Sequence, residues 1–80
     1  MEVPTEEAAL QRLEVAELYR DMGQGPKAAK YFCQAAELYY RMSKAQRAGE
    51  LYKVALDLDP QCAEAQQGMQ RLMGGGPPAA

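Results

Sequence analysis

A short stretch of this chain occurs twice, and that internal repetition limits the folds available to it. Residues 16–23, AELYRDMG, return at residues 36–43 as AELYYRMS, and the tripeptide ELY occurs again at residues 50–52. Self-similarity of this kind is typical of stacked helical units, each of which buries its apolar face against the next. The sequence therefore predicts an all-α chain built from repeated helices.

Three breaks interrupt the apolar pattern, and each has the chemistry of a helix boundary. Gly23 can adopt the left-handed conformation that ends a helix, and Pro26 has a φ angle that suits a first helical turn. Ser43 precedes Gln46 by three residues, which predicts a capping box at the start of the next helix. Asp59, directly before Pro60, is predicted to cap the last helix.

Between the breaks, apolar residues recur at spacings of three and four, which indicates one buried stripe on each helix. The pattern predicts helices at residues 5–22, 26–42, 44–57 and 60–73, all within one domain of residues 5–73. Residues 1–4 are expected to form an N-terminal extension and residues 74–80, GGGPPAA, a flexible tail. The stripes end with Met22 on the first helix and Met73 on the fourth, and the third begins with Ala45.

Large and small side chains alternate along the second and third predicted helices at the spacing of a known family. The residues are Phe32, Ala35, Ala36 and Tyr39, then Ala48, Tyr52 and Ala55, and finally Pro60. In this pattern, residues 29–62 resemble one full tetratricopeptide repeat. The resemblance implies two stacked antiparallel helical hairpins that form a fragment of a right-handed superhelix, and a protein-binding role.

A weaker match to the same family overlaps the first one. It uses Ala16, Tyr19, Gly23, Ala28, Phe32 and Ala35, with Arg12 in place of the aromatic residue and Tyr40 in place of the proline. The second helix can therefore be either member of a pair. In the family, the first helix of each repeat lines the concave, ligand-binding face, so the sequence leaves open which helices form that face here.

Composition argues against catalysis and against several classes of partner. The chain has no His and only two Cys among 80 residues, which excludes His-based triads and metal sites. Cys33 and Cys62 lie too far apart for a CxxC motif and are interpreted as small apolar core residues. We therefore expect no enzyme activity, no cofactor and no metal.

Charge and hydropathy indicate where the chain acts. The formal net charge is −2 and no basic cluster stands out, so nucleic acid is not an expected partner. No apolar run is long enough to cross a bilayer and the N-terminus lacks the features of a secretory signal, so we expect no membrane insertion. Few cysteines favour a reducing compartment, the cytoplasm or else the nucleus.

The sequence analysis predicts an adaptor or scaffold that binds a peptide or a helix of another protein. The residues predicted to contact this partner are Lys30, Gln34, Glu37, Tyr40 and Arg41, on the second helix. An exposed Tyr is a common interface anchor, although Tyr40 could instead pack against the first or third helix.

Two alternatives remain open at this point. About two repeats are present where roughly three or more are usual for stability, so the chain could complete its core as a homodimer. It could also be a three-helix domain of the microtubule-interacting-and-transport type, which binds partner helices. Residues 60–73 distinguish the two folds: their disorder, or their continuation of the third helix, would favour that alternative.

Overall fold

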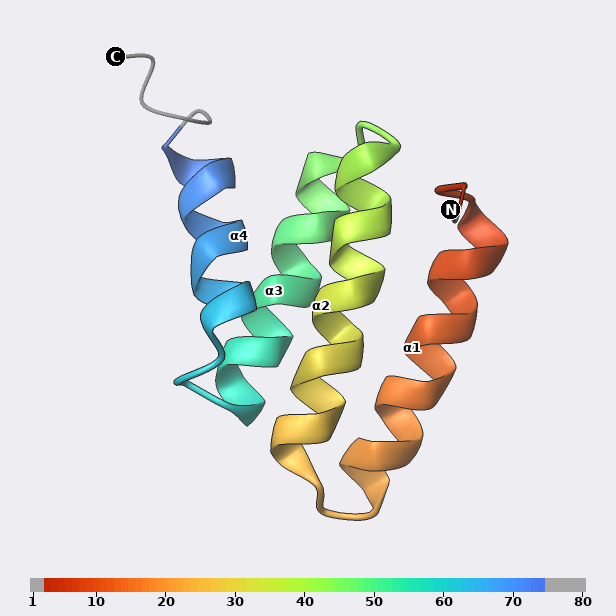
Figure 1. Cartoon of the computed structure of the whole chain (residues 1–80), viewed down its shortest axis with the longest axis vertical. Coiled ribbons are helices and arrows are strands. Elements are labelled where there is room, and N and C mark those ends of the chain that lie inside the picture. The colour runs from red at the N-terminus through yellow and green to blue at the C-terminus, as the bar shows by residue number, and fades with distance from the viewer. Residues whose placement is uncertain (1–2, 75–80) are drawn as a thin grey trace.

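The structure, a computed structural model, describes residues 3–74, which form four α-helices joined by short connections (Figure 1). The helices are α1 (Glu6–Asp21), α2 (Gly25–Arg41), α3 (Ala45–Leu58) and α4 (Ala63–Met73). Because residues 3–74 contain no strand, the predicted all-α class with four helices is confirmed. The predicted tail lies outside the described residues from residue 75 onward.

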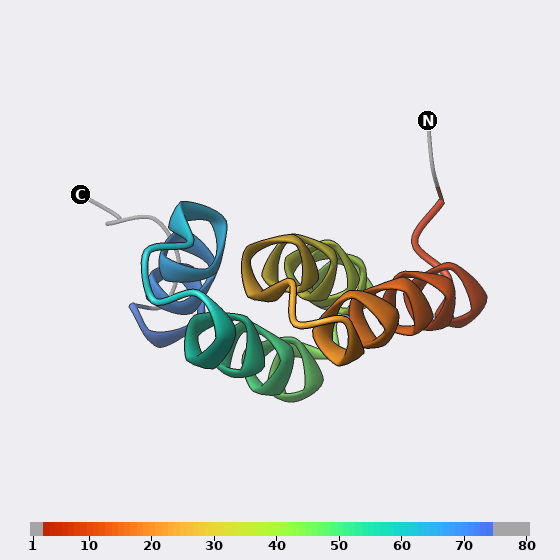
Figure 2. The same cartoon turned by 90° about the horizontal axis from the view of Figure 1, so that it is seen from below.

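Consecutive helices run antiparallel and are arranged in two layers. Figure 2 shows α2 and α4 in one layer and α1 and α3 in the other. Helix α2 packs against each of the other three helices, whereas within residues 3–74 α1 approaches no helix except α2. Helix α4 packs on α3 and α2 as a separate helix. Residues 63–73 are therefore neither disordered nor a continuation of α3, which favours the four-helix expectation over the three-helix alternative.

The core combines fully buried alanines with a few large side chains. Ala35, Ala36 and Ala48 have no exposed surface, and they allow the backbones of α2 and α3 to approach closely. Tyr39 and Tyr52, each 2% exposed, fill the space beside these alanines. Phe32 and Ala55, which also belong to the repeat pattern, are buried as well. Pro60, the last member of the pattern, is exposed in the α3–α4 connection.

The ends of the predicted stripes are not buried. Met22, the C-cap of α1, is 60% exposed. Met73 is 76% exposed at the end of α4, and Ala45 is exposed in the first turn of α3. These three expectations were wrong because each residue lies at an end of its helix, where the core does not enclose it.

Helices α1 and α2 end in the same way, at equivalent positions of the internal repeat. Gly23 has φ 76° and Ser43 has φ 66°, both in the left-handed region. In α1 the amide of Gln24 donates to the carbonyl oxygen of Tyr19 (2.9 Å), and in α2 the amide of Lys44 donates to that of Tyr39 (2.9 Å). Both turns are Schellman motifs, which satisfy the last carbonyl groups of a helix.

The predicted capping box at Ser43 is wrong. Lys44, not Ser43, is the N-cap of α3, and no side chain caps this helix. Ser43 cannot cap α3 because its left-handed backbone conformation already ends α2.

The start of α4 also differs from the prediction. The helix begins at Ala63 with Cys62 as its N-cap, three residues later than expected. Asp59 is the C-cap of α3, and its Oδ1 accepts a hydrogen bond from the amide of Gln61 (3.2 Å). The Asp59-Pro60 pair therefore forms a turn between the two helices instead of capping α4.

Candidate functional site

A groove runs between α2 and α4, and we refer to it as the α2–α4 groove. Its volume is about 450 Å³, within the range of ligand sites in proteins. Tyr52 of α3 lines its base, and Arg12 reaches it from α1. The other lining residues come from the two helices at its sides: Cys33, Gln34, Glu37, Leu38 and Arg41 of α2, and Glu64, Gln67, Gly68 and Arg71 of α4.

A polar network connects the three helices that form the groove. The Arg71 guanidinium donates from Nη2 to Glu37 Oε2 (2.8 Å) and to the hydroxyl oxygen of Tyr52 (3.3 Å). The Tyr52 hydroxyl in turn donates to Glu37 Oε2 (3.2 Å). Hydrogen bonds that involve a charged group are stronger than neutral ones, so this network fixes α4 relative to α2 and α3.

The Tyr52 hydroxyl serves this network as a neutral donor. Burial and the nearby Glu37 carboxylate raise the pKa of Tyr52 to about 12, because both disfavour the phenolate. The hydroxyl therefore keeps its proton throughout the neutral range. Its geometry supports a structural hydrogen bond and gives no sign of an acid–base role.

Tyr40 packs on the same arginine from the other side of the network. The Arg71 guanidinium carbon lies 4.6 Å from the centre of the Tyr40 ring, which is a cation–π distance. Tyr40 is half-buried and does not line the groove. Its ring therefore contacts α4, a helix that the sequence analysis did not name as a neighbour of Tyr40.

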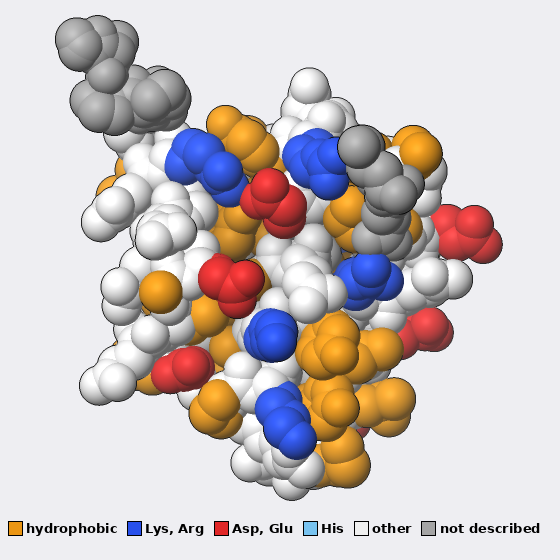
Figure 3. All heavy atoms as spheres, in the orientation of Figure 1, with side chains coloured by type: hydrophobic (Ala, Val, Ile, Leu, Met, Phe, Trp, Pro, Cys, Tyr) orange, Lys and Arg blue, Asp and Glu red, His pale blue; other side chains and the backbone are white. Residues whose placement is uncertain are grey.

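Arg12 and Arg41, two arginines that line the groove, differ in whether another side chain engages them. Arg12 Nε donates to Gln34 Oε1 (2.9 Å), which links α1 to α2. Within residues 3–74, no hydrogen bond or ion pair engages the exposed Arg41. Figure 3, which views the face formed by α2 and α4, shows acidic and basic side chains interspersed over these helices. The groove therefore presents both signs of charge, with Arg41 available to a ligand.

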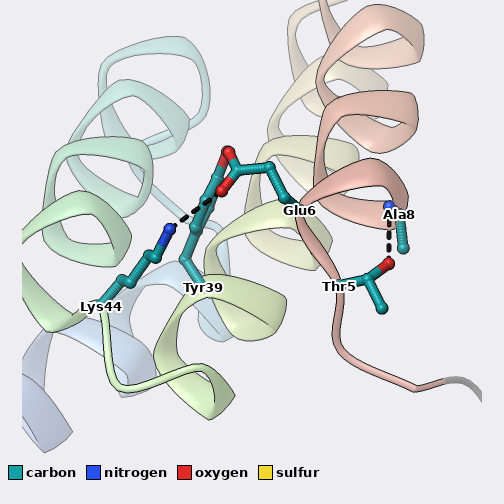
Figure 4. Close-up of polar contacts among 5 residues, drawn as sticks. All are labelled: Thr5, Glu6, Ala8, Tyr39 and Lys44. Carbon is teal, nitrogen blue, oxygen red and sulfur yellow. Dashed lines mark hydrogen bonds and ion pairs between the residues drawn. The ribbon is translucent and has the colours of Figure 1, made fainter.

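A second polar cluster, centred on Glu6, lies at the opposite edge of α2 (Figure 4). Glu6 Oε2 accepts a hydrogen bond from the Tyr39 hydroxyl (2.7 Å) and Oε1 accepts one from Lys44 Nζ (2.9 Å). These contacts, with Lys44 first and Tyr39 second, lower the pKa of Glu6. Thr5 caps α1, the helix that Glu6 begins, by accepting a hydrogen bond from the Ala8 amide (3.1 Å). The cluster ties the start of α1 to the α2–α3 turn.

Three of the five predicted contact residues come together in the groove. Gln34, Glu37 and Arg41 line it, on successive turns of one face of α2. Lys30 is exposed on α2 but is not among the lining residues, and Tyr40 packs against Arg71 outside the groove. The structure therefore does not place these two residues at the site.

The contribution of α4 is absent from the sequence-based prediction. Glu64, Gln67 and Arg71 are spaced by three and four, which is the pattern of a single polar helix face. This signal was present in the sequence. Arg12 had no comparable signal, because its place beside Gln34 depends on how α1 crosses α2.

Comparisons of the chain with protein-family models, with curated protein sequences and with solved structures find no match. No helix within residues 3–74 combines the length and apolar character needed to cross a bilayer. No group of three or more His, Cys, Asp or Glu residues within them is arranged to hold a metal ion.

Proposed function

We propose that this chain is a protein–protein interaction module of tetratricopeptide-like architecture, and that the α2–α4 groove binds a peptide or a helix of a partner protein. The observation that carries the proposal is that α2 and α4 lie in one layer and enclose a groove between them. An adaptor or scaffold in the cytoplasm, or in the nucleus, is the role that fits best.

The repeat pattern supports this choice of groove. If residues 29–62 are one repeat, α2 is its first helix and α4 is the first helix of the next repeat. In tetratricopeptide proteins, first helices line the ligand-binding face. The stronger repeat match and the arrangement of the helices in layers therefore favour the same pair, α2 and α4, as the binding helices. In this proposal the four helices are a fragment of a right-handed superhelix.

The charges of the groove suggest what kind of peptide would bind. Arg41 is exposed and unpaired within the described residues, and it can pair with a carboxylate. Glu64 on the opposite side can pair with a basic side chain. We therefore expect a peptide that carries both an acidic and a basic residue, and Gln34 and Gln67 can bond to its backbone.

A library of random peptides, selected against the folded chain, tests the proposal. Enriched peptides should shift the amide NMR signals of residues along the groove, with Gln34 and Gln67 among them. The Arg41→Glu variant should weaken binding of an acidic peptide about tenfold or more, because it replaces attraction by repulsion. Lys53→Glu is the matched control, since it makes the same charge change at an exposed residue of α3.

Two results would contradict this function. Equal loss of affinity in the Lys53→Glu and Arg41→Glu variants would indicate a general charge effect instead of a groove contact. Enriched peptides whose NMR shifts map to α1 or to the far side of α3 would move the site elsewhere.

A second candidate function, self-assembly, is favoured by an apolar depression at the other side of α4. It has a volume of about 420 Å³, and Gly49 of α3 and Met69, Leu72 and Met73 of α4 line part of it. A further helix could pack there, and in a homodimer a second copy would supply it. Sedimentation equilibrium over a concentration series separates the two functions: dimers at micromolar concentration that a Leu72→Glu substitution dissociates would favour self-assembly.

A further inference from the structure

Cys33 and Cys62, 29 positions apart in the sequence, place their sulfur atoms 3.6 Å apart. Cys33 is in the middle of α2 and is 3% exposed, and Cys62 is the half-buried N-cap of α4. Both are free thiols. The sequence-based interpretation of these residues as core fillers explains the burial of Cys33 but not its contact with the other cysteine.

The geometry leaves little movement between this contact and a covalent bond. A disulfide has a sulfur–sulfur distance of about 2.05 Å, so the two atoms would need to approach by about 1.5 Å. Cys62 belongs to the short connection between α3 and α4, which can adjust more readily than the interior of a helix. Cys33 can remain where it is, among the buried residues of α2.

We propose that Cys33 and Cys62 are a redox modification site, at which a reversible intramolecular disulfide fastens the start of α4 to the middle of α2. The oxidant it would take is a low-molecular-weight disulfide such as oxidised glutathione. The closed loop would contain the second half of α2, the α2–α3 turn and all of α3. The disulfide would also fix the separation of α2 and α4 at one end of the groove, since Cys33 lines the groove.

The reaction has two exchange steps. The more exposed Cys62, as a thiolate, attacks one sulfur of oxidised glutathione, which forms a mixed disulfide and releases one glutathione thiolate. Cys33 then loses its proton and attacks Cys62 Sγ, which forms the protein disulfide and releases the second glutathione. In total, two protein thiols lose two electrons and two protons, and these convert one glutathione disulfide to two thiols.

The environment of Cys33 determines the speed of the second step. Burial, together with the neighbouring Cys62 and the acidic Glu64 and Asp59, raises the pKa of the Cys33 thiol. Ring closure should therefore be slow at neutral pH and faster as the pH rises. The same burial shields the finished disulfide from attack by reducing thiols.

Peptide mapping of the full chain after treatment with excess oxidised glutathione tests the proposal. Free thiols are alkylated after an acid quench, and mass spectrometry identifies how each cysteine is linked. We expect a Cys33–Cys62 link within a monomer, reversed by dithiothreitol. Because the link closes a loop of about 30 residues, it should raise Tm by roughly 10 °C or more.

The single variants Cys62→Ala and Cys33→Ala provide the controls. In both, oxidised glutathione should leave Tm unchanged within about 2 °C, because no ring can close. Cys62→Ala is the more informative of the two, since Cys62 is half-buried and its truncation disturbs the core less. The treatment needs no ligand, so its result is independent of the function proposed for the groove.

Three results would overturn the proposal. The first is a mixed disulfide that persists on Cys62 while Cys33 stays free at alkaline pH. The second is disulfide-linked dimers in place of the intramolecular bond. The third is an oxidised monomer whose Tm is equal to or lower than that of the reduced chain.

Discussion

The ring of Tyr52 lies against the backbone of α4 at Gly68, in the space that a side chain at residue 68 would occupy. A Cβ atom placed on Gly68 would lie 2.5 Å from Tyr52 Cε1 and 2.6 Å from Cε2, closer than van der Waals contact allows. Gly68 is thus the residue that lets α4 approach α3. It also brings Arg71, one turn later, to the Tyr52 hydroxyl.

Gly68→Ala should therefore destabilise the chain. The added methyl group must displace a buried aromatic ring or push α4 outward, and overpacking of this kind costs about 1–3 kcal/mol. Urea denaturation followed by far-UV circular dichroism measures the free energy of unfolding. An unchanged or raised midpoint would show that α4 does not pack against Tyr52 in this way.

Gly49→Ala is the matched control for that substitution. A Cβ atom on Gly49 would lie 3.5 Å from Leu72 Cδ1, which is ordinary contact. Because Ala is the better helix former, this variant should be about 0.5–1 kcal/mol more stable than the parent chain. The two Gly→Ala changes are thus expected to have opposite signs.

Ser43→Gly should stabilise the chain by about 1 kcal/mol. Ser43 has φ 66°, and a left-handed conformation costs a residue with a Cβ atom roughly 1–2 kcal/mol, part of which is offset by the greater flexibility of Gly when unfolded. Thermal unfolding should give a Tm several degrees higher. Ser43→Ala keeps the Cβ atom and should give no such gain. A gain of equal size from Ala would assign the effect to the lost hydroxyl.

Acid should weaken the contact between α1 and the α2–α3 turn. The hydrogen bonds from Lys44 and Tyr39 lower the pKa of Glu6 in the folded chain, so the unfolded chain takes up this proton first as the pH falls. The contribution to stability is complete above about pH 4.5 and is lost as the pH falls through the pKa of folded Glu6. Carboxyl NMR titration should show a raised Glu6 pKa in Lys44→Met and no change in Lys53→Met.

Alkali should weaken the network at the base of the α2–α4 groove. Burial and Glu37 raise the pKa of Tyr52 to about 12, so the folded chain holds this proton more tightly than the unfolded chain. The resulting stability is complete below about pH 10 and is lost as the pH rises towards 12. Tyr52→Phe should cost about 1 kcal/mol at neutral pH and decline less steeply in alkali. Equal slopes for both proteins between these pH values would assign the alkaline loss to another group.

The sequence was sufficient to predict the four helices because their signals are local. Three-and-four spacing of apolar residues and the Gly23 and Asp59 breaks depend on residues that are near one another in the chain. Ser43 was misinterpreted because two local rules compete at this position. Its sequence pattern fits a cap for α3, but the equivalence with Gly23 in the internal repeat indicates the end of α2, and the structure follows the repeat.

The groove was only half predictable. Gln34, Glu37 and Arg41 lie on one face of a single helix, so periodicity was enough to group them. The pairing of Glu37 with Arg71, and the contact of Cys33 with Cys62, bring together residues 34 and 29 positions apart. Such contacts depend on which layer each helix occupies, and the two overlapping repeat patterns left that open.

The central place of α2 has a consequence for how the chain folds and opens. Almost all contacts between helices join two helices that are consecutive in the chain. Proteins with such local contacts fold fast, because little entropy is lost in closing short loops. Helix α1 is held by α2 alone among the helices of residues 3–74, so it can detach while the other three remain together. Amide protons of α1 should therefore exchange with solvent sooner than those of α2, whose release requires the whole structure to unfold.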